Sequence, residues 1–164
     1  MQDNAKMDFI FFVDAMLGNI AKKLRIMGFD CKYDSQIDDE DLIKQANKEN
    51  RIIISRDVNL IKQSSKFGIE SIFLEKKEEF DQLSEIFRKL SMKNIEVSGD
   101  KARCPKCNFK TESIEKKLIS NKIPYGVKQK NEKYWICRNC DKIFWEGSHM
   151  IELKKLARKL NEKY

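Results

Sequence analysis

Two pairs of cysteines in the C-terminal part of the chain place the strongest constraint on its fold. Each pair has two residues between its members, Cys104 with Cys107 and Cys137 with Cys140. Zn²⁺ takes four thiolates in a tetrahedron, and such a closed shell leaves no position for a substrate. The spacing therefore predicts a small zinc ribbon that holds one structural Zn²⁺. Two disulfides or two redox-active pairs are the alternatives, although the chain shows no sign of a secretory context.

The length of 164 residues leaves room for one ordinary domain and a small one. Residues 8–97 carry enough Ile, Leu, Val and Phe for a hydrophobic core. Residues 98–149 are poorer in apolar side chains, and a region of that size usually needs a metal to fold. An apolar stripe at helical spacing predicts a final amphipathic helix over 150–164.

Charge is distributed unevenly along the chain. Residues 1–97 hold 16 Lys and Arg against 18 Asp and Glu, whereas residues 98–164 hold 17 against 8. Four thiolates and one Zn²⁺ would lower the net positive charge of residues 98–164 only slightly. A basic surface of this kind attracts polyanions such as RNA. The alternative is a solvated, lysine-rich surface without a partner.

The N-terminal residues 1–8 are polar, so we expect no signal peptide. The longest apolar run, 9–13, is far too short to cross a membrane. We therefore expect a cytoplasmic protein, in which a reducing environment keeps thiolates free for zinc.

Short strand-like segments alternate with helical periodicities in the first domain. Apolar runs and turn signals predict helices that follow each strand and cross over to the next. The expected strands are 9–13, 31–33, 51–55 and 71–74, and the expected helices are 16–27, 39–49, 58–66 and 79–91. This alternation predicts an α/β three-layer sandwich with a mainly parallel sheet.

Acidic residues stand at three places in this pattern. Asp14 ends the first expected strand, Asp57 follows the third, and an acidic run at 38–41 begins the helix between them. Because the carboxyl ends of parallel strands share one edge, these carboxylates can meet there. Like charges held close need a cation, and oxygen ligands select Mg²⁺ or Mn²⁺, the requirement for metal-assisted phosphodiester hydrolysis. Alternatively, Asp14 and Asp57 are helix caps and the 38–41 run is a solvated helix start.

The expected ribbon carries aromatic side chains among basic ones. Trp135, Phe144 and Trp145 lie close in sequence to a set of basic residues that includes Lys128, Lys130 and Arg138. Aromatic faces beside basic groups suit unstacked RNA bases. Alternatively, Trp135 and Phe144 fill the small core of the ribbon. His149, the single histidine, is open to three interpretations: an RNA or phosphate contact, an extra metal ligand, or a helix cap.

Several of these segments, in this order, resemble the mut-seven C-terminal RNase domain family. The resemblance covers roughly residues 9–150 and both parts of the chain. It is carried by FVDAMLG at 12–18, Ala21, Leu24 and Arg25, GFD at 28–30, the acidic run 38–41, RIIISRD at 51–57, both cysteine pairs and FWEGSH at 144–149.

The resemblance implies a PIN-like nuclease domain fused to a zinc ribbon, and hence a metal-dependent ribonuclease, expected to act as an endonuclease with one or two Mg²⁺ or Mn²⁺. It carries metal-ligand roles onto Asp14, Asp57 and one or more of Asp38, Asp39 and Asp41. Asp39 is preferred, because the apolar residues after it set the helix register. PIN-type sites often have a fourth acid near the third, and here Asn59 stands two residues after Asp57, so the fourth ligand stays open.

The expected partner is single-stranded or structured RNA, such as tRNA or rRNA. Arg25 and Arg56 are expected to hold phosphate, or else to pair with nearby acids. Lys128, Lys130, Arg138, Trp145 and His149 are the expected RNA contacts of the ribbon. The alternative function is a non-catalytic RNA-binding or ribosome-associated adaptor, in which the acids are only caps.

Overall fold

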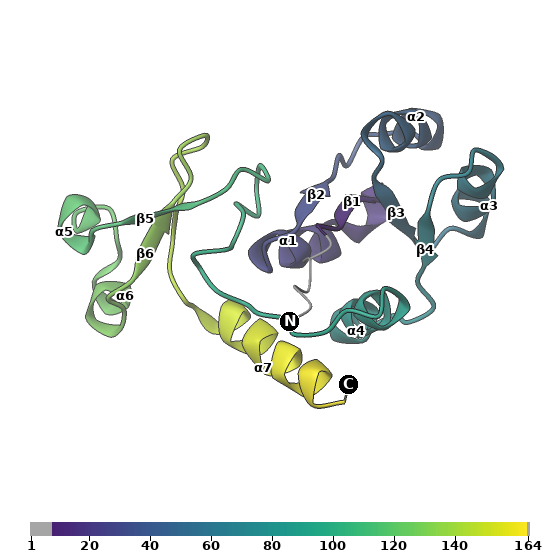
Figure 1. The fold of residues 1–164 in the computed structure, drawn as a ribbon. Coiled ribbons are helices and arrows are strands. Elements are labelled where there is room, and N and C mark those ends of the chain that lie inside the picture. The colour runs from purple at the N-terminus through teal and green to yellow at the C-terminus, as the bar shows by residue number, and fades with distance from the viewer. Residues whose placement is uncertain (1–7, 164) are drawn as a thin grey trace, which may run out of the picture.

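The computed structural model describes residues 8–163 (Figure 1). Residues 1–7, on which the expectation of no signal peptide rests, lie outside the described part of the chain, as does Tyr164 at the end of the expected C-terminal helix.

The first domain is built on a sheet of four parallel strands in the order β2-β1-β3-β4. The strands are β1 (Ile10–Val13), β2 (Asp30–Lys32), β3 (Ile52–Ser55) and β4 (Ser71–Phe73). All four residues of β3 and three of β1 are buried, as expected for central strands covered on both faces. The predicted parallel sheet is confirmed.

Helices cover both faces of this sheet. A short 3-10 turn, η1 (Ala15–Leu17), leads into α1 (Gly18–Ile26), and α2 (Asp39–Glu49), α3 (Val58–Lys66) and α4 (Glu79–Lys89) follow the next strands. Phe11 and Val13 point into one core with α1 and α4. Phe12 points into a second core with α2 and α3. Because neighbouring residues of β1 enter opposite cores, the arrangement is the predicted three-layer sandwich.

The second part of the chain contains an antiparallel sheet in the order β5-β6-β7. Its strands are β5 (Glu112–Ile114), β6 (Tyr134–Ile136) and β7 (Ile143–Phe144). Two short helices, α5 (Lys116–Ile119) and α6 (Tyr125–Lys130), separate β5 from β6 and were not expected. Ile119, Ile123 and Tyr134 form a small core beneath them.

The final helix, α7 (Ser148–Glu162), packs against the first domain (Figure 1). Leu153, Ala157 and Leu160 belong to the same core as α1 and α4. Ile95 and the segment around it also enter this core, and the Asn161 side chain both donates to and accepts from the Ile95 backbone at 2.8 Å. The chain therefore returns to the first domain after the ribbon.

Gly28 ends α1 in a left-handed conformation, with φ of 95°. A Cβ atom at this position would lie 2.7 Å from the carbonyl oxygen of Lys101. Glycine is therefore needed for two reasons, the turn itself and the close approach of the segment that leads into the first cysteine pair.

A buried arginine joins the two parts. Arg25 donates through Nε to the carbonyl of Cys31 at 2.8 Å and through one terminal nitrogen to the carbonyls of Pro105 and Lys106 at 2.9 and 3.3 Å. This placement corrects the expectation of a phosphate contact at Arg25. Its charge is directed to backbone carbonyls inside the protein, and it clips the first cysteine turn onto the end of α1 and β2.

Replacement of Arg25 by Met should destabilise the whole chain, because the carbonyls of Cys31, Pro105 and Lys106 lose the donor that this side chain supplies. We expect a loss of roughly 2–4 kcal/mol of unfolding free energy in a denaturant titration. Arg88→Met, at an exposed position of α4, is the matched control and should change stability little. Equal losses in both variants would contradict this role.

Candidate functional site

The acidic edge, defined as Asp14, Asp38, Asp39 and Asp57, lies where β1 and β3 end and α2 begins. Asp14 directly follows β1, and its backbone N–H donates to the carbonyl of Ile54 at 2.9 Å. Asp57 lies two residues beyond the end of β3. Parallel pairing of β1 with β3 therefore brings both acids to the carboxyl edge of the sheet, where ligands bind in folds of this kind.

A buried serine ties the two strand ends together. Ser55 Oγ donates to Oδ2 of Asp14 at 2.6 Å and accepts the backbone N–H of Asp57 at 2.9 Å. The hydroxyl thus fixes the orientation of the Asp14 carboxylate. The sequence analysis assigned no role to Ser55, and the available signal was its place as the polar last residue of an otherwise apolar strand.

Two of the acids also cap helices. Oδ1 of Asp57 accepts the backbone N–H groups of Asn59 and Leu60 at 2.7 and 3.4 Å, and Oδ1 of Asp38 accepts that of Asp41 at 2.8 Å. The capping interpretation is therefore correct for Asp57. In both Asp57 and Asp38, the cap bonds use only one oxygen of the carboxylate. Asp14 makes no side-chain cap bond to η1.

Electrostatics link the members of the acidic edge. The pKa of Asp39 is raised by burial and then by the charges of Asp14, Asp57 and Asp38. The charges at two strand ends, on Asp14 and Asp57, and at one helix start, on Asp38, therefore all act on the half-buried Asp39. Asp41 is exposed, and no shift of Asp39 is due to it. The expected ligand role of Asp39, with Asp41 as support, stays a prediction.

The acidic edge is a looser arrangement than the cysteine site. Among residues 8–163, only the four cysteines bring three or more metal-ligating atoms within 4.8 Å of one another. Carboxylates at wider spacing suit a hard cation that keeps several of its waters, as Mg²⁺ does. The donor set, oxygen atoms carrying excess negative charge, fits Mg²⁺ or Mn²⁺ and would not favour a soft metal.

A polar groove of about 460 Å³ adjoins Asp14, along η1 and the start of α1. Arg56, Lys22 and Lys77 line it and supply positive charge beside the acids. The nearby Glu79 is already paired with Lys23, whose hydrogen bond is the main cause that lowers the Glu79 pKa. Arg56, which precedes Asp57 in the chain, therefore lines a basic groove, and its expected phosphate contact stays a prediction.

The four cysteines form two turns of the same geometry. In the first, the N–H of Asn108 donates to the carbonyl of Cys104 at 2.9 Å, and in the second the N–H of Asp141 donates to that of Cys137 at 2.7 Å. Asn108 and Asp141 both have positive φ, 68° and 60°. This repeated turn aims both thiols of each pair toward a common centre.

The sulfur atoms pair across the two turns, and no disulfide is formed. Cys104 Sγ lies 3.5 Å from that of Cys140, and Cys107 Sγ lies 3.4 Å from that of Cys137. Burial raises the pKa of Cys107, but donors that include the Phe109 backbone N–H outweigh it and lower the pKa overall. A compact group of four sulfur ligands can hold a metal such as zinc.

The expected RNA contacts of the ribbon fall in three places. Lys128 and Lys130 lie on α6, at the end of the ribbon remote from the first domain (Figure 1). Arg138 is exposed and pairs with Glu112 at 3.1 Å. Trp145 and His149 instead line an apolar pocket between the ribbon and α1. The structure therefore does not bring these five residues into one surface.

The fold and its two sites define an α/β protein with an acidic sheet edge and an attached four-cysteine module. Residues 10–157 match the Mut7-C RNAse domain family, so the chain belongs to that family. The match spans both parts of the chain and indicates a nuclease-type function with RNA as the substrate. A search of curated proteins finds no match. Within residues 8–163, every helix is too short or too polar to span a membrane.

Purified chain should contain about one zinc per molecule by mass spectrometry of its metals, because four thiolates complete a tetrahedral shell. Cys104→Ser removes one ligand and should lower both the zinc content and the unfolding temperature. Cys31→Ala is the matched control, since Cys31 is buried outside the sulfur cluster, and it should keep its zinc. Full zinc content in Cys104→Ser would contradict the assignment.

Asp39→Asn should stabilise the protein when divalent cations other than zinc are absent. Because the folded pKa of Asp39 is raised, its ionisation disfavours folding. That penalty is absent in acid, below about pH 4, and develops as the pH rises through the folded pKa. The variant should therefore unfold at a higher temperature than wild type near neutral pH, and the difference should vanish in acid.

Glu40→Gln serves as the control for this stability measurement. Glu40 is an exposed neighbour whose carboxylate pairs with Lys44 at 2.9 Å, so neutralising it should give no stabilisation. Equal unfolding temperatures of wild type and Asp39→Asn near neutral pH would show that the carboxylates do not repel one another.

Proposed function

We propose that the protein hydrolyses RNA phosphodiester bonds at the acidic edge with the help of Mg²⁺ or Mn²⁺. The observation that carries the proposal is the convergence of carboxylates from three elements on Asp39, whose pKa rises through burial and the charges of Asp14, Asp57 and Asp38. Like charges gathered in this way are stabilised by a cation. Membership of an RNase family supports RNA as the substrate.

A divalent cation bound by these carboxylates would offset charge on the phosphoryl group and lower the pKa of a water molecule. Asp14, Asp39 and Asp57 are the residues that would hold this cation. They supply negative charge at one edge of the sheet. Ser55 keeps Oδ2 of Asp14 in place by donating a hydrogen bond to it. The helix-capping bonds of Asp57 fix that carboxylate in the same way.

Phosphate binding is assigned to the basic groove. Arg56 is exposed and lines the groove with Lys22 and Lys77, so a phosphate next to the scissile one can contact positive charge there. Asp38 and Asp57 are exposed. An internal phosphodiester of an RNA strand can therefore reach the acidic edge without a free RNA end entering an enclosed channel. We therefore propose an endonuclease, in which the zinc ribbon adds basic surface for RNA.

Asp14→Asn should abolish metal-dependent cleavage while leaving the fold intact. We expect the rate on a labelled single-stranded RNA with Mn²⁺ to fall at least about a hundredfold, the scale seen when one group that acts in the transition state is lost. Glu70→Gln changes an exposed acid next to the opposite edge of the sheet and should cleave like wild type. A circular RNA tests the endonuclease mode, since it has no end.

Equal cleavage by wild type and Asp14→Asn would sink the assignment of the site. Salt-sensitive RNA binding without Mn²⁺-dependent turnover in either protein would instead favour the non-catalytic adaptor, in which the acids serve only as helix caps.

A further inference from the structure

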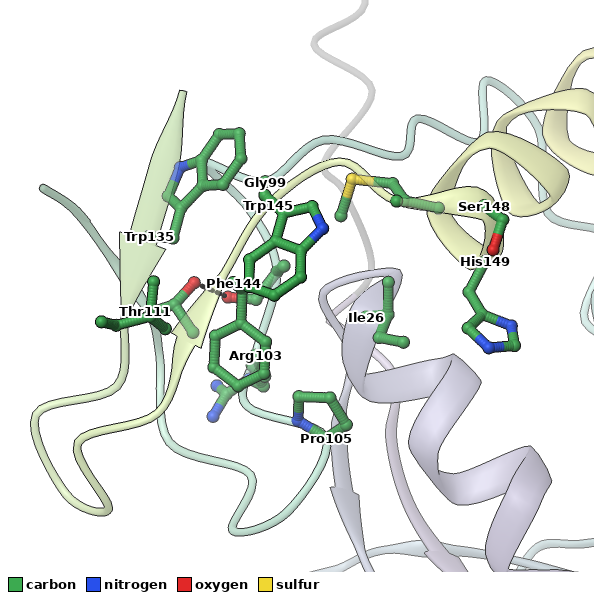
Figure 2. A pocket seen from close by; sticks show the side chains of 14 residues that line it. Ile26, Gly99, Arg103, Pro105, Thr111, Trp135, Phe144, Trp145, Ser148 and His149 are labelled. Atoms are coloured by element: carbon green, nitrogen blue, oxygen red, sulfur yellow. Dashed lines mark hydrogen bonds between the residues drawn. The ribbon is translucent and has the colours of Figure 1, made fainter. Parts of the chain in front are cut away.

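A pocket of about 420 Å³ lies between the first domain and the ribbon (Figure 2). Four separate segments build its walls: the end of α1, the stretch 99–111 that contains the first cysteine pair, Trp135 of β6, and the stretch 143–150 that runs from β7 into α7. The size is that of a small-molecule site, and the proposed cleavage chemistry makes no use of it.

Aromatic rings form much of the lining. Figure 2 shows Phe144 and Trp145 facing Ile26 and Pro105 across the pocket. Both residues are only partly buried. Accessible aromatic faces opposite apolar side chains are the surfaces on which proteins stack unpaired bases, and the stacking depends little on base identity.

Trp135 forms a fixed wall of the pocket. It is buried, and its Nε1 donates to Asp100 at 2.9 Å. A Cβ atom at Gly99 would lie 2.3 Å from its ring, so the ring and the backbone are in close contact. This wall is set by the fold and does not need a ligand to form.

Polar groups of Arg103 and of the start of α7 border the pocket and suit a nucleotide. Arg103 Nε is the one buried side-chain nitrogen or oxygen in residues 8–163 that has no hydrogen-bond partner. The first turn of α7 also borders the pocket, and Gly147 before it supplies no side-chain cap. Backbone N–H groups at such a helix start favour an anion. The excess of Lys and Arg in residues 98–164 also favours an anion.

We propose that this pocket binds one unstacked base of the RNA, with the adjoining phosphate at the start of α7. The RNA identity of this ligand rests on the proposed function. Phe144 and Trp145 stack on the base. Arg103 supplies a donor to a base or phosphate oxygen through a side-chain rotation that breaks its Nη1 hydrogen bond of 2.9 Å to the Asn108 carbonyl.

The position of the pocket relative to the acidic edge links base binding to the choice of the cleaved phosphodiester. Gly18 at one end of α1 lines the groove beside Asp14, and Ile26 at the other end lines the pocket. At 1.5 Å per residue these helix ends are about 12 Å apart. A base held in the pocket therefore fixes, through one rigid helix, which nearby phosphodiester reaches the acids.

Intrinsic fluorescence tests the proposal directly, because the two tryptophans of the chain, Trp135 and Trp145, both line the pocket. Zinc-loaded full-length protein is titrated with AMP, CMP, GMP and UMP, and with ribose 5-phosphate, which lacks a base. We expect saturable quenching by one or more nucleotides and none by ribose 5-phosphate. No saturable change with any of the four nucleotides would overturn the proposal.

Variants separate stacking from loss of structure. Trp145→Ala should weaken nucleotide binding about 5- to 150-fold, the range for losing one base–aromatic stack, with Trp135 still present as the reporter. Trp145→Phe keeps a ring and should bind nearly as tightly as wild type. Zinc content and near-ultraviolet circular dichroism confirm that both variants fold. Unchanged affinity in folded Trp145→Ala would contradict the proposal.

Asp14→Asn distinguishes this proposal from the proposed function. It should bind nucleotides like wild type, because Asp14 lies at the other end of α1. The nucleotide titration decides the pocket whatever the cleavage assay gives: Asp14-dependent cleavage without nucleotide binding refutes the pocket alone, and nucleotide binding without cleavage refutes the hydrolytic function alone.

Discussion

The parallel pairing of β1 with β3 is the contact on which the candidate site depends. It sets Val13 beside Ile54, so the next residue of one strand, Asp14, meets the last residue of the other, Ser55. The hydrogen bond between their side chains is buried and charge-assisted, and its partner bond holds the backbone of Asp57. A slip of one residue in this register would turn both Asp14 and the apolar residues of β1 to the wrong faces.

Helix α1 connects this edge to the rest of the molecule. Its start follows Asp14 and borders the basic groove, and its end carries Arg25, which holds the first cysteine turn. Asn108 strengthens the same junction by accepting the N–H of Cys31 and donating to Asp30 at 2.8 Å. The cysteine module is therefore built onto the nuclease-like domain, and α7 then returns to pack on that domain's core.

The sequence predicted those features that depend on local pattern or on a general rule of topology. The four strands and their helices followed from periodicity, and the placement of Asp14 and Asp57 at one edge of the sheet followed from the parallel pairing of the strands before them. Ser55 and Arg25 show where this reasoning ends. The partner of Ser55 follows another strand, and two of the three carbonyls that Arg25 holds, those of Pro105 and Lys106, lie some eighty residues away, so neither role has a local signature. The pocket was missed for the same reason, because four segments that are separate in the sequence form it.

Paramagnetic broadening by Mn²⁺ tests most directly whether the carboxylates act as one site. In a two-dimensional amide spectrum of the zinc-loaded protein, low concentrations of Mn²⁺ broaden the signals of residues near the bound ion. The account predicts selective loss of the signals around Asp14, Asp39 and Asp57 together, at the same Mn²⁺ concentration. Broadening confined to one of these segments, or spread evenly over exposed acids elsewhere in the chain, would contradict it.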